Sequence, residues 1–579
     1  MAQAQKRAFN EGKRHFKKNK KQKASVVEGS NEDVLLADVR RLLKETKLDD
    51  GQEEKTELPA QHSEIELNIH SLSSTGDGLA HRDGQVYVVP FTAPGDTVTA
   101  KVFKHVPDES YTLTDFLSVK HPSPHRTEKP RCPYFTQCSG CQFQHLPYSY
   151  QLAHKKTIVE KAYANFSNLP ASSIPAVGET IGSPLQYGYR TKLTPHFDGP
   201  PGGRRDNRHG KKVTWAEVPA IGFMKKGTRK TMDIEECPIG TESVQRGLRR
   251  ERERVKENID QYQRGATLLL RESTERVEKN GKTMDGDEDV VVEDMGDHIH
   301  RKTCITDNKA TSTEYVDTFR FDNPAGAFFQ NNNSILPLIT QYIRDNILGP
   351  ASTPTTNPKP QIKNLIDAYC GSGFFTIALS ATFTHTIGID IAAQSIASAR
   401  HNADLNSLPA NSTTFLAADA NDLFASIPHS NTNSSSSDGG ASFAPEETVV
   451  VIDPPRKGCD AGFIRQLLRF GPARVVYARD VGWLVGDGGV GLADEEGLPV
   501  KGLYEIESLT GFDFFPMTGH VEGVAVLRRK RKEAGKDPVE VEAVAAKWNA
   551  AIPDGQDSAS GGAHHAAAAG QSSSTAAAM

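Results

Sequence analysis

From Asn364 onward the chain alternates between apolar strands and helices, and this alternation constrains the fold more than any other feature of the sequence. The strands NLIDAYC, TIGID, TTFLAAD and TVVVID are separated by helical segments, which predicts a parallel α/β sheet. Open sheets of this kind bind their ligands beyond the carboxyl ends of the strands. The polar residues that follow these strands are therefore the first candidates for a binding site.

A glycine turn follows the first of these strands. Gly371-Ser372-Gly373 leads into a helix, and the next strand ends in Asp390. A glycine turn lets a ligand approach the backbone at the start of a helix, and an acid about 20 residues further on can bind ribose hydroxyls. The third glycine, typical of turns that seat the pyrophosphate of a dinucleotide, is missing. An adenosyl ligand such as S-adenosylmethionine fits better, and an ordinary turn without a ligand is the alternative.

The motif Asp453-Pro454-Pro455 ends another strand of the predicted sheet. Prolines cannot donate backbone hydrogen bonds, so the chain has to leave the sheet at this point. That geometry would hold Asp453 over a reacting centre. A simple strand-ending turn is the alternative, but D-P-P-R after four β-branched residues favours a functional role.

The rest of the chain predicts further folded parts separated by low-complexity segments. A length of 579 residues suggests several domains, because one domain usually takes about 100–200 residues. Short strands begin at Ile65 and are separated by the turn signals TGDG, HRDG and APGD, which predicts a small barrel of the oligonucleotide-binding (OB) type. The boundaries that we expect are a basic disordered tail at 1–58, the barrel at 60–122, a central α+β domain at 123–320, the α/β domain at 321–532 with a disordered loop at 428–447, and a low-complexity tail at 533–579. Within the first tail we expect at most one helix, near VLLADVRRLLKET.

Composition excludes membrane and secreted classes. No apolar run reaches the length of about 18 residues that a transmembrane helix needs, and no apolar stretch follows the N-terminal charges as in a secretory signal. Seven cysteines are too sparse for a disulfide framework and indicate a reducing compartment. We expect a monomeric intracellular protein, with nucleus, cytoplasm and mitochondrion all open. The basic block at 6–23 fits an RNA-binding arm, a nuclear-import signal or a solvated tail.

Four of the seven cysteines form a set with metal-ligand spacing. They are Cys132, Cys138, Cys141 and, far downstream before a proline, Cys237. Four thiolates with a close C-x2-C pair fit a [4Fe–4S] cluster or zinc, and four buried cysteines without metal are the alternative. A structural clamp between the barrel and the central domain is the simplest role for such a site, because nothing in the pattern indicates redox catalysis.

Five segments occur in the order of a known motif series: NPAGAFFQNN, LIDAYCGSG, GIDIAAQSIASARHNADLN, VVVIDPPRKG and GFDFFPMTGHVE. In these motifs the chain resembles the RNA uridine-C5 methyltransferase family, over about residues 60–530. The barrel is similar to the TRAM domain of that family, and the last motif is similar to fungal-type tRNA (uracil-5-)-methyltransferases. The resemblance implies a class I S-adenosylmethionine-dependent methyltransferase fold, which is Rossmann-like, for the C-terminal domain. It also favours an iron–sulfur cluster at the cysteine set over zinc or empty thiols.

The resemblance implies roles for individual residues. The positions that contact S-adenosylmethionine are Gln330, Tyr369, Asp390 and Asp453, and Glu522 falls on the general base. Phe374 occupies another contact position, but its apolar side chain makes it a weak candidate. Asp390 replaces the usual glutamate with a shorter carboxylate, and Met517 stands where the family usually has glutamine.

The nucleophile of the family reaction is missing from this chain. In the family a cysteine thiolate adds to C6 of uracil, and a carboxylate removes the C5 proton after methylation. That cysteine should follow the strand RVVY in a Ser-Cys-Asn segment, but Tyr477 passes directly to Ala478. None of the seven cysteines fills the gap, and Cys459 is better explained as a structural residue. Either a wrongly removed in-frame intron shortened the deduced sequence, which we favour because Glu522 and Asp453 persist, or the chain is catalytically inactive.

The substrate implied by the resemblance is tRNA, at the T-loop uridine of position 54, giving 5-methyluridine. A uridine in a folded loop has to leave its stack before C5 can react. Arg190 and Lys192 in YGYRTKL fit phosphate contacts or solvated charges. The alternatives are another RNA such as rRNA, methylation of an exocyclic amine, which has no use for the terminal His-Val-Glu, and an inactive RNA-binding protein.

Overall fold

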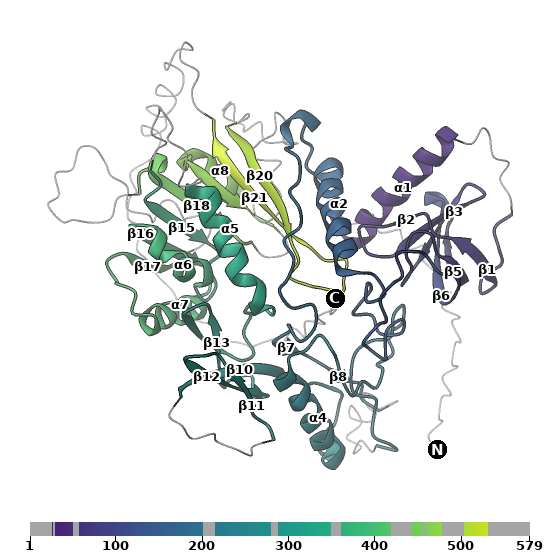
Figure 1. Cartoon of the computed structure of the whole chain (residues 1–579), viewed down its shortest axis with the longest axis horizontal. Coiled ribbons are helices and arrows are strands. Elements are labelled where there is room, and N and C mark those ends of the chain that lie inside the picture. The colour runs from purple at the N-terminus through teal and green to yellow at the C-terminus, as the bar shows by residue number, and fades with distance from the viewer. Residues whose placement is uncertain are drawn as a thin grey trace, which may run out of the picture.

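The computed structural model describes residues 26, 29–49, 57–200, 215–279, 288–348, 361–418, 443–454, 458–459, 461–477 and 503–530. The basic block at 6–23, the loop predicted at 428–447 apart from its last residues, and the tail at 533–579 lie outside these residues. Figure 1 shows three parts: a barrel with α1 at one side, a central part around α4, and a C-terminal sheet, with α2 between the sheet and the barrel. Within the described residues, no helix is long and apolar enough to cross a membrane.

The N-terminal barrel is a six-stranded sheet in the order β1-β5-β6-β4-β3-β2. Its strands are β1 (Glu64–Asn68), β2 (Ser71–Leu72), β3 (Gly78–Arg82), β4 (Gln85–Val89), β5 (Thr97–Val106) and β6 (Tyr111–His121). Tyr87, Val89, Val98 and Ala100 alternate with outward-facing residues and form its core. The turn between β3 and β4 contains Gly84 with φ +70°, a conformation that glycine adopts without steric cost. The OB-like barrel predicted from the spacing of turn signals is confirmed; five strands were expected, and the described sheet has a sixth, the two-residue β2.

Helix α1 (Asn31–Asp49) corrects the prediction of a disordered tail at 1–58. Leu35, Leu36, Val39 and Leu42 lie on one face of this helix and pack against the barrel strands β3 and β4. The helix lies at VLLADVRRLLKET, where the sequence predicted at most one helix. Its apolar stripe is buried by a sheet that lies later in the chain.

The central part is an α+β arrangement, as predicted. Its elements are α2 (Tyr148–Phe166), β7 (Lys192–Leu193), β8 (His196–Phe197), α4 (Glu242–Glu257), β9 (Ala266–Thr267), β10 (Leu270–Glu278), β11 (Val291–Asp294), β12 (His298–Ile305), β13 (Thr311–Val316) and β14 (Phe319–Pro324). Strands β11, β12, β10 and β7 form one sheet, and two further pairs are β13 with β14 and β8 with β9. Helix α4 lies on this sheet, and Gly247 permits the contact because a Cβ at that position would lie 2.1 Å from Cys304 Sγ.

The C-terminal sheet has seven strands in the order β17-β16-β15-β18-β19-β21-β20. They are β15 (Asn364–Ala368), β16 (His385–Asp390), β17 (Thr413–Ala417), β18 (Thr448–Ile452), β19 (Arg474–Tyr477), β20 (Tyr504–Phe512) and β21 (Glu522–Arg529). The first five are parallel, and β21 runs antiparallel to both β19 and β20. The order reverses between β15 and β18, and such a switch point is where open α/β sheets bind ligands.

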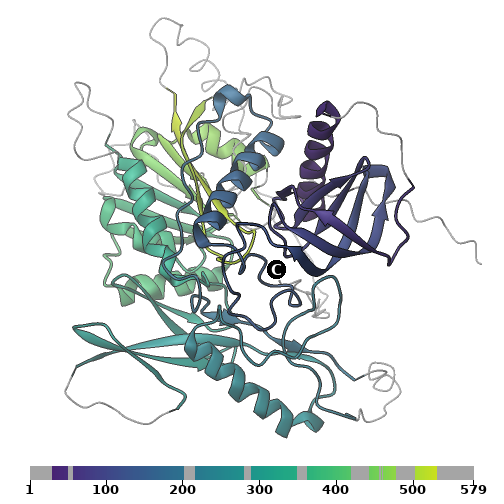
Figure 2. The same ribbon diagram turned by 45° about the vertical axis from the view of Figure 1, so that its right-hand side comes forward.

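Helices cover both faces of this sheet (Figures 1 and 2). They are α5 (Leu336–Leu348), α6 (Phe374–Ala378), α7 (Ala393–Leu405) and α8 (Ala461–Phe470). Helices α5, α6 and α7 pack on one face, which includes Leu365, whereas α8 and the central helix α2 pack on the other face, which includes Ile366. Short 3-10 helices are η1 (Pro107–Glu109), η2 (Ala171–Ser173), η3 (Ile259–Gln261), η4 (Asn333–Ile335), η5 (Ser380–Thr382) and η8 (Pro445–Glu447). The predicted Rossmann-like α/β domain is confirmed.

Candidate active site at the carboxyl edge of the sheet

The strand register brings three predicted site residues to one edge of the sheet. Tyr369, Asp390 and Asp453 each lie at the carboxyl end of β15, β16 or β18. In the register, Ala368 lies opposite both Ile389 and Ile452. Because parallel strands in register end together, these three residues are neighbours at the switch point of the sheet.

Asp390 holds the glycine turn in place. Its Oδ2 accepts the N–H of Gly371 at 3.1 Å, and its Oδ1 accepts the N–H of Ala392 at 2.8 Å. Gly371 and Gly373 have φ of +55° and +89°, and a Cβ on Gly373 would lie 3.1 Å from the Phe415 ring. An ionised carboxylate has about four lone-pair sites, so Asp390 keeps acceptor capacity for ribose hydroxyls.

Tyr369 adopts a backbone conformation that residues other than glycine rarely take. Its φ is +64°, and its ring lies 5.4 Å from the ring of Phe463 on α8. A residue in this region costs on the order of 1–3 kcal/mol, and such strain gathers at binding sites. The turn after β15 is therefore shaped by the surrounding packing and not by local preference.

A buried carboxyl that sequence reasoning did not select lies beneath the turn. Asp367 Oδ2 accepts the N–H of Thr376 at 2.9 Å and its hydroxyl at 2.6 Å, whereas Oδ1 is buried without a hydrogen-bond partner in the described part of the chain. Burial, together with the nearby charges of Asp453 and Asp390, raises the pKa of Asp367 to about 7, against the two hydrogen bonds from Thr376, which lower it. The sequence feature that could have indicated Asp367 is its place in the predicted strand NLIDAYC, which leads into the glycine turn.

The carboxyl groups at this edge of the sheet indicate the charge and the hydrogen-bond donors of a ligand that would fit there. Asp367, Asp390 and Asp453 lie within electrostatic range of one another around one glycine turn. The partly or fully exposed members of this set can attract a cationic ligand and accept hydrogen bonds from ribose hydroxyls. S-adenosylmethionine, with its sulfonium and ammonium groups, matches this set of residues.

Gln330 and Phe374 differ in their surroundings. Gln330 is half-buried and directly follows Phe329, whose ring lies 6.1 Å from the ring of Phe374 at the start of α6. Phe374 itself is 7% exposed and packs in the apolar core against Phe321. The loop that carries Gln330 thus rests on the helix that follows the glycine turn, whereas Phe374 serves that packing.

Glu522 reaches the same edge from the opposite direction. It is the exposed first residue of β21, and Ala525 of that strand lies opposite Tyr477 of β19. Because β21 is antiparallel to β19, Glu522 extends roughly 10 Å beyond the level of Tyr477, at about 3.4 Å per residue. The segment after Tyr477, where the cysteine is expected, lies outside the described residues. Cys459, the other candidate thiol, packs against the core, and the Tyr477 hydroxyl donates to its Sγ at 3.7 Å.

A buried ion pair fixes the loop that precedes Glu522. The Lys155 ammonium of α2 donates to Asp513, and both side chains are fully buried. The Tyr148 hydroxyl donates to the other carboxylate oxygen of Asp513 at 2.9 Å, and Lys155 also donates to the Phe515 carbonyl at 3.0 Å. The backbone N–H of Met517 donates to Gln151 Oε1 at 3.1 Å. Helix α2 thus holds the loop 513–517 at several points.

The loop that carries Cys132, Cys138 and Cys141, called the cysteine-bearing loop below, holds the next part of the segment before Glu522 together with the barrel. Gln142 Oε1 accepts the N–H of Gly519 at 3.0 Å, while its Nε2 donates to the Thr75 carbonyl in the barrel turn at 2.7 Å. The N–H groups of Gln142 and Phe143 both donate to the Met517 carbonyl. A Cβ on Gly519 would lie 3.2 Å from the backbone of Gly76. The loop before Glu522 is therefore enclosed by three separate parts of the chain.

Comparisons with known proteins agree with this geometry. A family model described as tRNA (Uracil-5-)-methyltransferase matches residues 317–530, and a TRAM domain model matches 61–107. A tRNA (uracil(54)-C(5))-methyltransferase of Schizosaccharomyces pombe is 40% identical over 539 residues, which cover 91% of this chain and 87% of that protein. The chain belongs to the tRNA (uracil-5-)-methyltransferase family. The enzyme of the same name from Saccharomyces cerevisiae is 36% identical over 540 residues, which cover 86% of this methyltransferase and 78% of that protein.

A solved structure supports the fold of this methyltransferase. The Pyrococcus abyssi tRNA (uracil-54, C5)-methyltransferase, in complex with S-adenosyl-L-homocysteine, superposes with a TM-score of 0.50 at 20% identity. The match covers 80% of this chain and 100% of that chain. At this identity the likeness extends to the fold only. The predicted family, the TRAM barrel and the class I methyltransferase fold are confirmed.

The four cysteines of the predicted set lie near one another in the methyltransferase. All four are free thiols, and burial raises the pKa of each, that of Cys141 to about 12. The pKa of Cys237 is raised further by Cys141, Cys138 and Cys132, although Cys237 is about a hundred residues downstream of them. Among the described residues, no group of three His, Cys, Asp or Glu side chains could hold a single metal ion.

Two basic residues of the segment YGYRTKL have internal roles in the methyltransferase. The Lys192 ammonium donates to the carbonyls of Gly326 and Ala327, both at 3.1 Å, and supports the loop that leads to Gln330. The Arg190 Nε donates to the Lys192 carbonyl at 3.3 Å. Lys192 therefore acts within the protein in this structure, where the sequence allowed a phosphate contact or a solvated charge.

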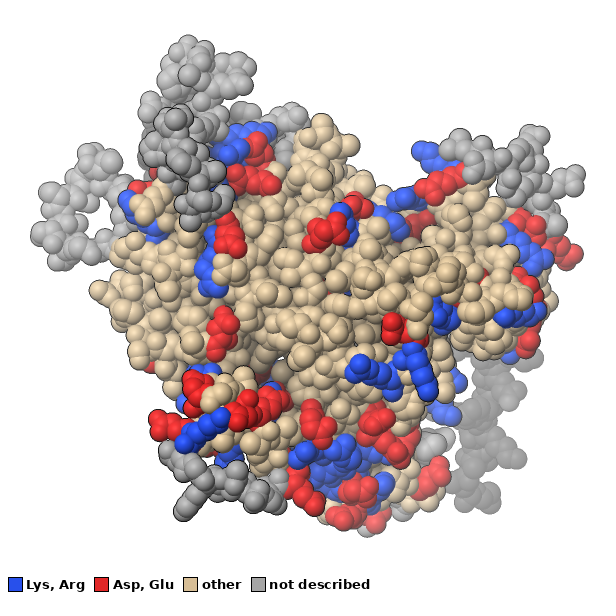
Figure 3. All heavy atoms as spheres, in the orientation of Figure 1, with Lys and Arg blue, Asp and Glu red and all other residues tan. Residues whose placement is uncertain are grey.

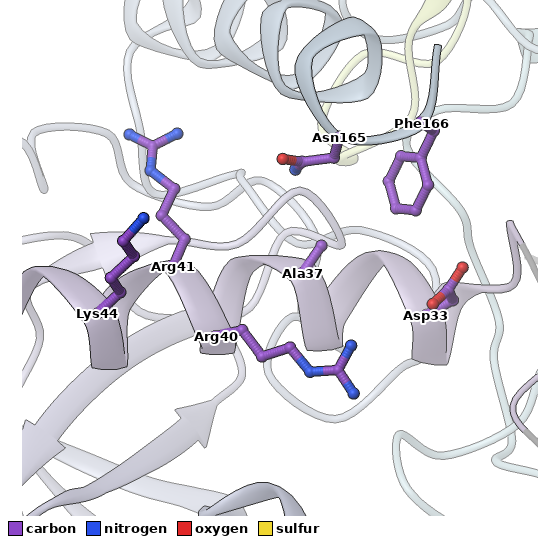
Figure 4. A pocket seen from close by; sticks show the side chains of 7 residues that line it. All are labelled: Asp33, Ala37, Arg40, Arg41, Lys44, Asn165 and Phe166. Carbon is purple, nitrogen blue, oxygen red and sulfur yellow. The ribbon is translucent and has the colours of Figure 1, made fainter. Parts of the chain in front are cut away.

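A hollow of about 470 Å³ lies apart from the carboxyl edge, between α1 and the end of α2. Figure 4 shows Asn165 and Phe166 of α2 facing Ala37 of α1 across it. Of its cations, Arg40 pairs with Glu109 and Arg41 with Glu45. Two of its three cations are thus paired within the protein, and nothing in the lining indicates a ligand.

Proposed function

We propose that this methyltransferase transfers a methyl group from S-adenosylmethionine to C5 of a uridine in tRNA, at position 54 of the T-loop. The observation that carries the proposal is the strand register, which brings Asp390, Asp453 and the start of β21 with Glu522 to one edge of the sheet. The relatives from the two yeasts are named for this reaction at uracil 54. An OB-like barrel, a fold that binds oligonucleotides, supports RNA as the substrate.

We assign a separate role in this reaction to each residue at the edge. S-adenosylmethionine supplies the methyl group as an electrophile when it is bound. Asp390 offers acceptors to its ribose, and Gln330, Tyr369 and Asp453 make the remaining contacts. Glu522 accepts the proton that leaves C5 after methylation, which is the task of a positioned general base. A cysteine thiolate is needed to activate C5, and this chain lacks it after Tyr477.

The first experiment tests the reaction and the missing segment together. The chain as written and a version with the Ser-Cys-Asn segment restored between Tyr477 and Ala478 are incubated with tRNA and labelled S-adenosylmethionine, followed by nucleoside analysis. We expect both to bind the cofactor, and only the restored version to form 5-methyluridine. N-methylated bases would indicate exocyclic-amine chemistry, and a preference for rRNA would change the substrate.

The origin of the gap is tested separately. Transcript sequence across Tyr477–Ala478 that contains the cysteine codon would support the enzyme, whereas contiguous codons would support an inactive RNA-binding protein. A thiol-dependent adduct of the chain as written with RNA that contains 5-fluorouracil would contradict the assignment of a missing nucleophile. Failure of the restored chain to bind S-adenosylmethionine would overturn the proposed function as a whole.

We also propose that the cysteine set holds a [4Fe–4S] cluster. The C-x5-C-x2-C spacing and the mutual nearness of Cys132, Cys138, Cys141 and Cys237 support four thiolate ligands. Zinc, which four thiolates can also bind, is the alternative. Iron and sulfide analysis after anaerobic purification should give four of each per chain, and less in Cys141→Ser. Zinc, or no metal, would contradict the cluster.

A further inference from the structure

A short basic turn beside the cysteine-bearing loop has no role in the site described above. Met224 and Thr231 form a β-bridge, and the N–H of Lys225 donates to the Lys230 carbonyl at 2.9 Å, so residues 225–230 (KKGTRK) form a closed turn. Gly227 has φ +73° at the tip. The backbone of the turn is therefore a defined structure, closed by these hydrogen bonds.

Most cations of the turn form no ion pair within the described residues, although the Asp115 carboxylate of the barrel lies near the tip, 3.6 Å from where a Cβ on Gly227 would be. Lys225, Arg229 and Lys230 are exposed, and none of them forms an ion pair with a carboxylate of the described residues. Lys226 alone pairs with an acid, Asp77 of the barrel, at 3.1 Å. Three unpaired cations within six residues raise the local potential and favour a polyanionic partner.

Helix α4 shows that this feature is not a consequence of basic composition alone. Its cations are paired with acids, and Figure 3 shows basic and acidic side chains interspersed on this part of the surface. The pairs are Arg246 and Arg249 with Glu242, Arg250 with Asp289, Arg252 with Asp233, Arg254 with Glu251, and Lys256 with Glu253. The positive charges of α4 are paired with carboxylates, whereas three of the four positive charges of the turn are not.

The attachment of the turn ties it to the active site. Lys225 forms a β-bridge with Cys138, the N–H of Lys226 donates to the Gln137 carbonyl at 2.8 Å, and the N–H of Ser139 donates to the Met224 carbonyl at 3.1 Å. The same loop continues to Gln142, which binds the segment before Glu522. The turn is thus attached to the same loop that hydrogen-bonds the segment preceding Glu522.

We infer that the turn 225–230 binds the phosphate backbone of the tRNA whose uridine reacts at Glu522. This inference rests on the proposed function, because it takes tRNA as the substrate. Lysine and arginine side chains that contact phosphates release counterions, so each contact steepens the dependence of binding on salt. The contact is independent of sequence and positions the RNA, while other parts of the protein select the uridine.

The salt dependence of tRNA binding tests the inference without requiring turnover. The full chain, the variant Lys225→Gln/Arg229→Gln/Lys230→Gln and a matched control, Arg246→Gln/Arg249→Gln/Lys256→Gln, are titrated with a tRNA transcript by fluorescence anisotropy at several salt concentrations. Both variants lose three positive charges. We expect the slope of log K against log salt to decrease in magnitude by about 2–3 in the turn variant, at roughly 0.7–0.9 per phosphate contact. The control should keep the slope of the unaltered chain.

A further variant separates charge from folding. Lys225→Arg/Arg229→Lys/Lys230→Arg keeps the three positive charges, so it should keep the slope of the unaltered chain. If the substitutions acted by disrupting the turn and not by removing charge, this variant would also bind tRNA more weakly. Binding of labelled S-adenosylmethionine should be unchanged in all variants. A turn variant with the slope of the control would overturn the inference alone, and an unaltered chain that binds no tRNA would overturn both the inference and the proposed function.

Discussion

Replacing Lys155 by methionine should release the loop that carries the general base. Lys155 and Asp513 are fully buried, and the Lys155 ammonium provides the positive charge next to the Asp513 carboxylate. Lys155→Met keeps the apolar stem but leaves Asp513 as a buried charge whose remaining donors are the Tyr148 hydroxyl at 2.9 Å and the Phe515 N–H at 3.2 Å. Breaking such a pair by removing one partner costs about 3–5 kcal/mol. Since about 1.4 kcal/mol corresponds to a factor of ten, opening of the loop should increase by roughly 10²-fold to a few 10³-fold.

Hydrogen exchange followed by mass spectrometry measures this opening in the full chain. Amides of residues 513–520 should exchange faster in Lys155→Met, and Lys156→Met is the matched control because the neighbouring Lys156 pairs only with the exposed Glu179. The double variant Lys155→Met/Asp513→Asn removes both charges, so its effect should be smaller than the sum of the single effects. Equal exchange in Lys155→Met and Lys156→Met, or strict additivity in the double variant, would refute the reasoning.

Three further outcomes are expected. In the chain with the restored cysteine segment, Glu522→Gln should lower 5-methyluridine formation by about 10²-fold or more and leave a covalent protein–RNA complex visible on a denaturing gel, with cofactor binding unchanged. Because the pKa of Asp367 is raised, the folded protein favours the protonated carboxyl, so the free energy of unfolding should fall by roughly 4 kcal/mol from about pH 4 to about pH 7. Asp367→Asn should remove this decline in urea unfolding. An unchanged pH profile in that variant would contradict the reasoning. Leu36→Ala should cost about 2–5 kcal/mol and accelerate exchange in α1, whereas a solvated tail would show no change.

The sequence permitted a prediction of the carboxyl edge because its residues follow directly from strand ends. In a parallel sheet, strands that pair in register end together, so Asp390 and Asp453 become neighbours once the alternation of strands and helices is recognised. Glu522 required the family resemblance, because its strand runs antiparallel and nothing local indicates which edge its first residue reaches. The contacts of these residues with cofactor and substrate stay predictions.

The supporting interactions could not be predicted in the same way. Lys155 and Asp513 are separated by 358 residues, and a lysine in a helix and an aspartate in a loop are both common on surfaces. Asp367 occupies a strand position, where only the structure shows that its carboxyl is buried beneath the turn. Helix α1 was placed correctly, but the burial of its leucines depends on the barrel face that they cover. In each case the decisive contact is made by a distant part of the chain.

The position of the general base depends on the RNA-binding parts of the molecule. The loop before Glu522 donates backbone hydrogen bonds to Gln151 of α2 and to Gln142 of the cysteine-bearing loop. It also touches the barrel turn, where a Cβ on Gly519 would lie 3.2 Å from Gly76. A backbone contact this close leaves no room for the barrel to shift without moving the loop. The barrel and the cysteine-bearing loop are therefore structural parts of the active site. An RNA contact that repositions them would therefore also move Glu522, the proposed general base.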